Sequence, residues 1–274
     1  MYRTCTQEDV TTLKQLWHAA FGDDDSFMNK VFGGFAPLNS IYVVEQAEGI
    51  VAMACAVPVS CNDRKGVYLY GVNTKKEMRG QGIMKGLLLH IHKECAKAGI
   101  VFSVLIPAEE SLFEWYGSFG YETMFTRRTL TRLIKRNIWA QADFDTVTAK
   151  KLEQLRKQFI KKNYIDHTAK GYESIVFEMY SGGASSVVNS FGYGIYYKNK
   201  DMLTFIELFS QNDVFAEQLI EAARERTGCE KAQVILPQGS TLFLGEGKFA
   251  PYGMLKYLDE PFRLDEPYMG LMMD

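Results

Sequence analysis

A strand, a glycine-rich loop, a helix and a second strand are predicted in succession in the first half of the chain. The run Val67–Thr74 has strand character, and Met84–Ala98 carries apolar residues at helical spacing before Gly99. Val101–Ile106 is then a short apolar run closed by Pro107, as expected for a strand buried on both faces. Two strands joined through a helix lie parallel with a right-handed crossover. The predicted helix face consists of Leu87, Leu88, Ile91, Cys95 and Ala98.

The second half repeats this order without the glycine-rich loop. Strand Met202–Leu208, helix Val214–Arg226 and strand Ala232–Leu236 are followed by Pro237. A chain of 274 residues suits two domains of about 130 residues. We therefore predict a duplicated α/β fold, with a first domain over residues 1–130 and a linker plus a second domain over 131–274. Two unrelated strand–helix–strand units are the alternative.

The other predicted elements complete this outline. A helix begins after the capping box at Thr6 and ends at Gly22. The acidic run Asp23–Asp25 is read as the start of a short helix, with attraction of a cationic substrate as the alternative. Further strands are predicted over Ser40–Gln46, Ile50–Val59 and Gly192–Tyr197, a helix over Thr146–Lys162, a connection over Thr131–Asp145 and a loop over Gly182–Ser186.

Charge and cysteine content narrow the function classes. Lys and Arg number 31 and Asp and Glu 33, so a net charge of −2 gives no global attraction to nucleic acid or an anionic membrane. The five cysteines form no C-x-x-C pair and the four histidines no recognisable ligand set, so neither a disulfide framework nor a metal site is expected. No apolar run approaches the roughly 20 residues that span a bilayer. A cytoplasmic protein is expected.

The glycine-rich loop is the most informative motif. It comprises Arg79, Gly80, Gln81, Gly82, Ile83 and Met84. At a helix start, unsatisfied N–H groups and the helix dipole favour a phosphate, and glycines allow its close approach. The string is not a P-loop, and Lys85 stands where a dinucleotide fingerprint needs its third glycine. In the acyl-CoA loop pattern, Arg79 and Gly82 match, while Met84 replaces the usual Gly or Ala. An ordinary glycine-rich helix start is the alternative.

Three blocks in this order resemble the GNAT superfamily of acyl-CoA-dependent N-acetyltransferases. They are Tyr70–Thr74, the glycine-rich loop, and Leu112–Tyr121, which is similar to the family's FY-x-x-x-GF/Y segment. The resemblance covers about residues 1–127. It implies mixed, mostly antiparallel sheets flanked by helices, acetyl-CoA as co-substrate and a primary amine as acceptor. A catalytic half followed by a half without the loop is similar to the tandem enhanced-intracellular-survival type, without its third domain.

The resemblance also implies roles for residues around the loop. The loop residues would hold the cofactor phosphates, with Arg79 and Lys85 adding charge or lying solvated at the surface. Val72, Asn73 and Thr74 would border the pantetheine arm, with a backbone N–H near Val72 facing the thioester carbonyl.

Two further groups are candidates for the proton transfers. Tyr116 matches the family's general acid, with a packed core tyrosine as the alternative, whereas Tyr121 is expected to pack. In the tandem relatives the terminal carboxylate enters the active site, which points to Asp274 as the base. A terminal strand without catalytic role and a water relay are the alternatives.

An N-acetyltransferase working by direct attack in a ternary complex is therefore the leading hypothesis. A non-catalytic acyl-CoA-binding sensor is the alternative, because Met84 departs from the pattern and the base is not fixed by a motif. An aminoacyl- or peptide-transferring enzyme ranks last, because the sequence has no strong basic run for RNA. The acceptor is open among aminoglycosides, polyamines, amino acid derivatives and protein N-termini.

Overall fold

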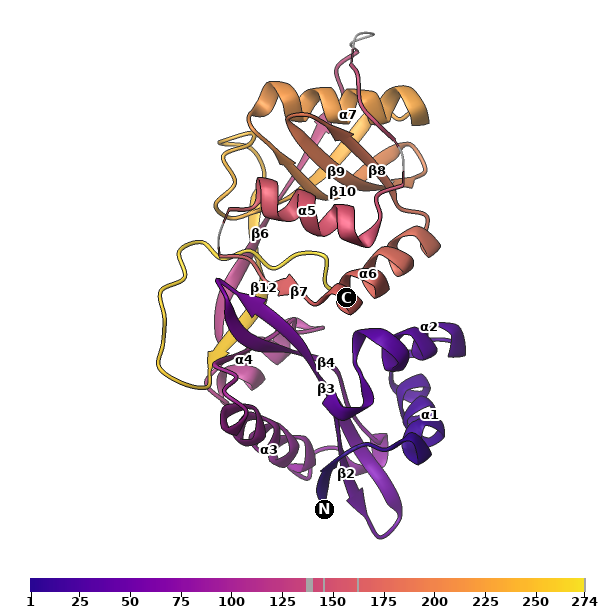
Figure 1. The fold of residues 1–274 in the computed structure, drawn as a ribbon, viewed down its shortest axis with the longest axis vertical. Coiled ribbons are helices and arrows are strands. Elements are labelled where there is room, and N and C mark those ends of the chain that lie inside the picture. Colours follow the sequence, from indigo (N-terminus) through magenta and orange to yellow (C-terminus); the bar gives the residue numbers. More distant parts are fainter. Residues whose placement is uncertain (137–139, 145, 162, 274) are drawn as a thin grey trace. The chain divides into compact units, whose positions relative to one another are not determined.

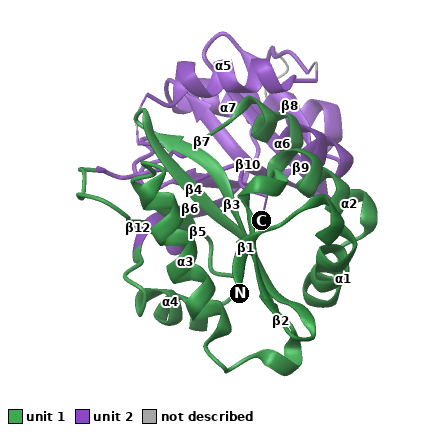
Figure 2. Cartoon of the chain, turned by 60° about the horizontal axis from the view of Figure 1, so that its bottom comes forward, with its two compact units in different colours: residues 1–122, 166–174, 254–263 green, residues 123–165, 175–253, 264–274 purple. Residues whose placement is uncertain are grey.

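The structure, a computed structural model, describes residues 1–136, 140–144, 146–161 and 163–273. Its contacts divide the chain into two compact units (Figure 2). Unit 1 comprises residues 1–122, 166–174 and 254–263, and unit 2 comprises 123–165, 175–253 and 264–274. Each unit contains segments from both predicted domains, and the division at residue 130 stays a prediction.

Unit 1 is a mixed sheet with helices on both faces (Figure 1). The strand order is β1-β2-β3-β4-β5-β12, where β12 contributes Met254–Tyr257, and the short β7 pairs with β3. Every recorded pair is antiparallel except β4 with β5, which are joined through α3. The elements are β1 Tyr2–Thr4, α1 Val10–Phe21, α2 Asp25–Lys30, β2 Ile41–Gln46, β3 Gly49–Cys61, β4 Arg64–Thr74, α3 Ile83–Lys97, β5 Phe102–Leu105, α4 Glu110–Gly117 and β7 Asp166–His167.

Unit 2 also contains a mixed sheet in which one parallel pair of strands is joined through a helix. The order is β6-β11-β10-β9-β8, and among the recorded pairs of these strands β10 and β11, joined through α7, are parallel while the others are antiparallel. Its elements are β6 Glu122–Leu133, α5 Ala149–Phe159, β8 Ser185–Asn189, β9 Gly192–Asn199, β10 Met202–Ser210, α7 Asp213–Thr227 and β11 Lys231–Pro237. Two further elements, α6 Ala169–Ser181 and β12 Lys248–Tyr257, contribute residues to both units. The predicted repeat of a parallel crossover in a mixed sheet is confirmed.

Amphipathic helices cover the sheets as the apolar spacing predicts. Leu87, Leu88, Ile91 and Cys95 of α3 are buried, but Ala98 is exposed because the helix ends at Lys97. In α7, Leu219 and Ile220 are buried. Gly22 ends α1 with φ of 79°, and the carboxylate of Asp24 caps α2 by accepting from the Phe27 N–H at 2.8 Å. The acidic run is therefore a helix start.

Several predicted elements differ from the observed ones. The expected connection Thr131–Asp145 begins inside strand β6, and the expected loop Gly182–Ser186 ends inside strand β8. The predicted helix Thr146–Lys162 is the shorter α5, and residues 145 and 162 lie outside the described residues. Helix α6 and strands β1, β6 and β12 were not predicted. No helix among the described residues is long and apolar enough to cross a membrane.

Candidate functional site

A bulge in β4 interrupts its regular pairing with β3 in the unit 1 sheet. Tyr70 pairs with Cys55 and Asn73 with Met53, so β4 has one residue more than β3 between these pairs. Gly71 permits the bulge with φ of 59°, and a Cβ there would lie 2.2 Å from the Trp17 ring. An alanine at this position would therefore clash with a buried side chain.

The end of β4 also extends beyond its recorded pairing with β5. The recorded pairing of β4 with β5 ends at Tyr68, although β4 continues to Thr74. Asn73 is buried, and its amide donates to the Gly71 carbonyl at 3.0 Å. The Oδ1 atom of Asn73 is buried without a hydrogen-bond partner among the described residues. A buried acceptor beside unpaired strand backbone fits a ligand with amide donors.

The glycine-rich loop follows this strand and begins α3. Gly80 and Gly82 have φ of 76° and 74°, and a Cβ on either would meet no atom within 4 Å. Gly82 is the N-cap of α3, so the N–H groups of the first helical residues have no intrahelical partner. The loop is thus an open cradle of backbone donors at the positive end of a 15-residue helix. Phosphate groups fit this cradle.

The side chains of the loop have separate tasks. Arg79 donates from Nε to the Thr74 carbonyl at 3.2 Å, which ties the loop to the end of β4. Gln81 donates to the Glu77 carbonyl at 3.4 Å. Met84 packs with Ile83 against the hydrophobic cluster beneath α3, so its size is accommodated by the core. The departure from the acyl-CoA loop pattern therefore leaves the backbone cradle open.

Tyr116 on α4 belongs to the same hydrophobic cluster, against which Val72 and Met84 also pack. Burial raises the pKa of Tyr116 to about 12, so its hydroxyl is protonated at neutral pH. Among the described residues this hydroxyl has no hydrogen-bond partner, and its oxygen is not one of the fully buried polar atoms. A protonated, uncommitted hydroxyl is what a general acid requires.

Tyr121 differs from Tyr116 in that its hydroxyl is hydrogen-bonded to two side chains. It lies 2.8 Å from His92 Nε2 and 2.7 Å from Ser103 Oγ, and all three side chains are buried. Burial, with a smaller contribution from Lys256, lowers the pKa of His92 to about 4. This neutral network fixes the end of α4, because the Tyr121 N–H donates to the Tyr116 carbonyl at 3.3 Å. The expected packing role of Tyr121 did not include the hydrogen bonds.

Asp274, the second predicted catalytic residue, lies outside the described residues. The preceding residues Tyr268–Met273 are described and buried in full. The segment that leads to the terminal carboxylate is therefore buried, while the role of that carboxylate stays a prediction.

The corresponding helix start in unit 2 is closed. The side chain of Asn212 accepts from the Phe215 N–H at 3.1 Å, and the Asp213 carboxylate accepts from the Phe243 N–H at 2.8 Å. A carboxylate at this helix start repels a phosphate, and the cap already occupies a donor. This geometry agrees with the absence of a glycine-rich loop from the second half of the sequence.

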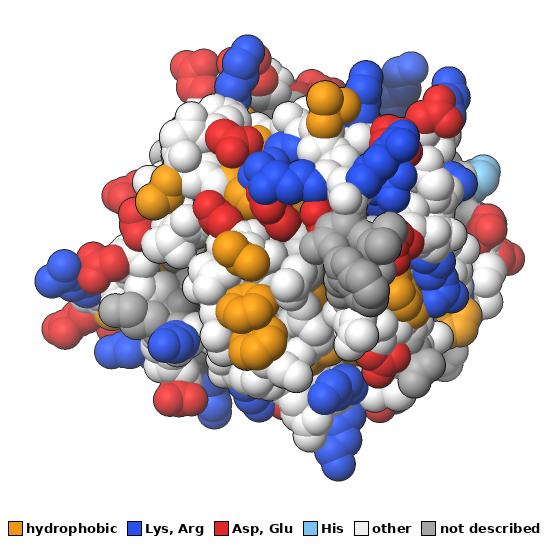
Figure 3. Space-filling model, turned by 90° about the horizontal axis from the view of Figure 1, so that it is seen from above, with side chains coloured by type: hydrophobic (Ala, Val, Ile, Leu, Met, Phe, Trp, Pro, Cys, Tyr) orange, Lys and Arg blue, Asp and Glu red, His pale blue; other side chains and the backbone are white. Residues whose placement is uncertain are grey.

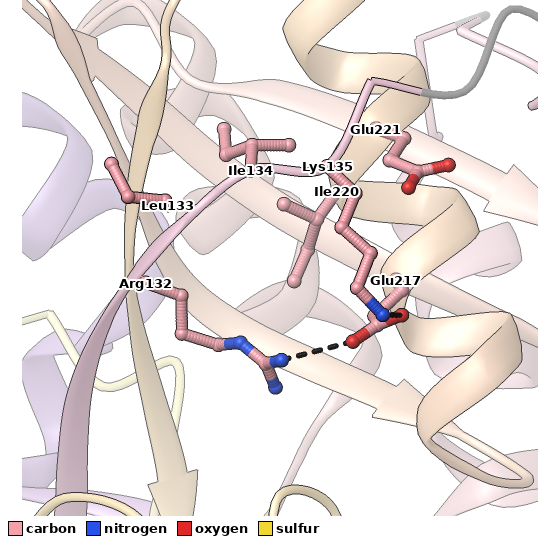
Figure 4. A pocket seen from close by; sticks show the side chains of 7 residues that line it. All are labelled: Arg132, Leu133, Ile134, Lys135, Glu217, Ile220 and Glu221. Carbon is pink, nitrogen blue, oxygen red and sulfur yellow. Dashed lines mark hydrogen bonds and ion pairs between the residues drawn. The ribbon is translucent and has the colours of Figure 1, made fainter.

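A small pocket in unit 2 offers no cofactor site either. Arg132 and Lys135 contact separate oxygens of Glu217 at 2.9 and 2.5 Å, so its central carboxylate is neutralised (Figure 4). The lining residues are Arg132, Leu133, Ile134, Lys135, Glu217, Ile220 and Glu221. Basic and acidic side chains are interspersed on the face drawn in Figure 3. No group of three potential metal ligands occurs among the described residues.

Comparison with known proteins defines the class of this chain. The family model of the acetyltransferase (GNAT) domain matches residues 1–124, which include β4, the glycine-rich loop and α4. Residues 1–124 of the chain therefore form an acetyltransferase (GNAT) domain. This finding confirms the predicted resemblance. No curated protein matches the sequence.

Solved structures extend the likeness of the fold to the whole chain. A protein from Enterococcus faecalis, described as a probable N-acyltransferase, superposes with a TM-score of 0.76 at 15% identity, over 94% of this chain and 72% of that one. Eis1 from Mycobacterium abscessus gives 0.72 at 10% identity, over 94% and 74%. A tandem GNAT protein from the clavulanic acid biosynthesis pathway gives 0.57 at 10% identity, over 96% and 99%. The predicted tandem GNAT fold is confirmed.

Proposed function

We propose that this protein is an N-acetyltransferase that moves the acetyl group of acetyl-CoA to a primary amine by direct attack in a ternary complex. The observation that carries the proposal is the open cradle at Gly80–Gly82, at the start of α3, shortly after a strand that extends beyond its recorded pairing with β5. Both features lie in the GNAT domain of unit 1.

The chain's own groups divide the binding task between loop and strand. Backbone N–H groups from Gly80 to Met84 would hold the phosphates, and the glycines allow contact without a Cβ in the way. The backbone around Val72, beyond the last recorded pair with β5, would meet the pantetheine arm, and an N–H there would stabilise charge on the thioester oxygen. Asn73 Oδ1 adds a buried acceptor on the same strand.

Tyr116 would supply the proton that the transfer requires. A neutral amine forms a bond to the acetyl carbon, the bond from that carbon to sulfur breaks, and the departing thiolate takes the phenolic proton. The raised pKa of Tyr116 keeps this proton in place at neutral pH. The excess proton of the amine would pass to the terminal carboxylate of Asp274 or to a water relay.

The test is amine-dependent release of free thiol from acetyl-CoA. A panel of an aminoglycoside, a polyamine, an amino acid amide and a peptide N-terminus covers the open acceptor classes. We expect at least one amine to accelerate thiol release, and Tyr116→Phe to lower the turnover number by about 10²- to 10⁴-fold. Because the cradle is unchanged, the affinity for acetyl-CoA should stay within about twofold of the wild-type value.

Tyr121→Phe is the matched control. This variant also removes a hydroxyl from the hydrophobic cluster, but the Tyr121 hydroxyl is hydrogen-bonded to His92 and Ser103. Tyr121→Phe should therefore lower the free energy of unfolding without a comparable loss of turnover. Acetyl-CoA binding without thiol release for any amine would instead favour the non-catalytic sensor. Equal loss of turnover in both variants would remove the assigned role of Tyr116.

A further inference from the structure

A charged pair is fully buried in unit 2. Arg156 of α5 and Glu207 of β10 have 0% side-chain exposure, and Arg156 Nη1 lies 3.7 Å from Glu207 Oε1. Two tyrosine hydroxyls donate to the carboxylate, Tyr193 at 2.9 Å and Tyr268 at 2.8 Å. Removing such charges from water is unfavourable, and an apolar cluster of similar volume is often as stable. The four residues, called the Arg156–Glu207 cluster below, therefore call for an explanation other than stability.

The C-terminal segment, residues 264–273, takes part in two of the recorded hydrogen bonds of this cluster. Tyr268 donates to Glu207, and Arg156 donates from Nη1 to the Gly270 carbonyl at 3.2 Å. Arg156 also donates to the Ile165 carbonyl at 3.4 Å. One guanidinium thus joins the C-terminal segment to the chain that runs beside it.

Backbone hydrogen bonds fix the other side of the same segment. The Tyr268 N–H donates to the Asn163 carbonyl at 2.7 Å, and the Ile165 N–H donates to the Tyr268 carbonyl at 2.9 Å. The Asn163 amide donates to the Asp265 carbonyl at 2.6 Å. The segment is therefore held by side chains and by backbone within six residues.

The local backbone constrains the register of the segment further. Glu266 and Leu271 have φ of 45° and 54°, and a Cβ on Gly270 would lie 1.9 Å from the Tyr268 hydroxyl. A shift by one residue would withdraw this hydroxyl from Glu207 and leave a buried carboxylate with one donor fewer. Such a loss is costly at a charged group, so the buried charge selects a single placement.

We propose that the Arg156–Glu207 cluster is a positioning device that fixes the register of the C-terminal segment. Tyr268 is the member of the cluster that belongs to the C-terminal segment. Arg156, Glu207 and Tyr193 lie outside the segment and form the site that its hydroxyl contacts. The consequence for turnover rests on the proposed function and on the first of its two proton acceptors, the terminal carboxylate. The placement of the segment does not rest on it.

Two tyrosine variants of the full-length protein test the placement. Tyr193→Phe and Tyr268→Phe each remove one hydroxyl donor to the same carboxylate, at nearly equal distance, but only Tyr268 belongs to the segment. The hydrogen-exchange rate of the peptide spanning 264–273 is compared between variants, each at a denaturant concentration that lies the same amount below its own unfolding midpoint. We expect exchange about tenfold or more faster in Tyr268→Phe, and within twofold of wild type in Tyr193→Phe.

Gly270→Ala is a third variant, chosen because an added Cβ would displace the Tyr268 hydroxyl without removing it. Like Tyr268→Phe, it should raise the hydrogen-exchange rate of the peptide spanning 264–273. Equal exchange of the segment in Tyr193→Phe and Tyr268→Phe, or unchanged exchange in both Tyr268→Phe and Gly270→Ala, would overturn the positioning role.

Kinetics separate this proposal from the proposed function. With the chain end displaced, the turnover number should fall in Tyr268→Phe while the dissociation constant for acetyl-CoA stays within twofold. Faster exchange with unchanged turnover would support the positioning device and contradict a catalytic chain end. Slower turnover with unchanged exchange would overturn the positioning device.

Discussion

The replacement Gly82→Ala tests the cradle, and Gly228→Ala is its matched control. Gly82 begins α3 with φ of 74°, whereas Gly228 ends α7 with φ of 75°. A Cβ on either glycine meets no atom within 4 Å. Both replacements therefore introduce the same left-handed backbone strain and no clash. Each should lower the free energy of unfolding by about 1–2 kcal/mol.

The two variants should differ in ligand binding. The methyl group added at position 82 would stand in the open space beside the free N–H groups of the first turn of α3, where the phosphates are proposed to lie. Loss of one charge-assisted backbone hydrogen bond corresponds to about 1.5–3 kcal/mol, or at least a tenfold rise in the dissociation constant. The methyl group added at position 228 would stand at the C-terminal end of a helix in unit 2, where no ligand is proposed to bind.

Urea unfolding and calorimetric titration with acetyl-CoA measure the two effects separately. We expect parallel unfolding shifts and a tenfold difference in affinity between the variants. Equal dissociation constants, with equal stability, would refute the reasoning that the backbone at Gly82 contacts the cofactor.

Two further predictions concern His92 and the chain end. Because burial lowers the pKa of His92 from 6.5 to about 4, the unfolded chain binds a proton in this range and the folded chain does not. The free energy of unfolding should therefore fall by up to about 3 kcal/mol as pH drops from about 6.5 to about 4. In His92→Gln this pH dependence should be weaker. An identical pH profile in that variant would contradict the assignment to His92. A short extension after Asp274 should lower turnover without weakening acetyl-CoA binding, and unchanged turnover would dismiss the carboxylate role.

Local patterns predicted the parts of the fold that depend on local chemistry. The apolar spacing of α3 and α7, and the glycines that flank them, define helices whose ends differ little from the predicted ones. The glycine-rich loop was equally visible, because positive φ and a helix start are encoded within six residues. Gly71 lies inside a predicted strand, and a glycine at such a position is a local signal of a bulge that the sequence analysis did not predict.

Elements that depend on distant partners were missed. Strand β6 carries Arg128 on its buried face, and this guanidinium donates to four carbonyls between Ser240 and Glu246. Such a residue breaks the apolar alternation expected of a strand. In β12, Pro251 and Gly253 are typical of a loop, and only pairing keeps the segment extended.

The Arg156–Glu207 cluster was missed for the same reason. Tyr268 and Glu207 are 61 positions apart, and an arginine on a helix is normally read as exposed. The sequence indicated the acid Tyr116 because a motif marks it, whereas burial and the uncommitted state of its hydroxyl depend on the packing of α4. Motif chemistry is local, but the support of a site comes from tertiary contacts.

Isothermal titration of the full-length protein with acetyl-CoA, read for stoichiometry, tests the central claim most directly. The open cradle at Gly82 and the closed helix start at Asn212 predict one site per chain. Two sites would contradict the assignment of unit 2 as unable to hold the cofactor. No binding at millimolar acetyl-CoA by folded protein would contradict the N-acetyltransferase itself.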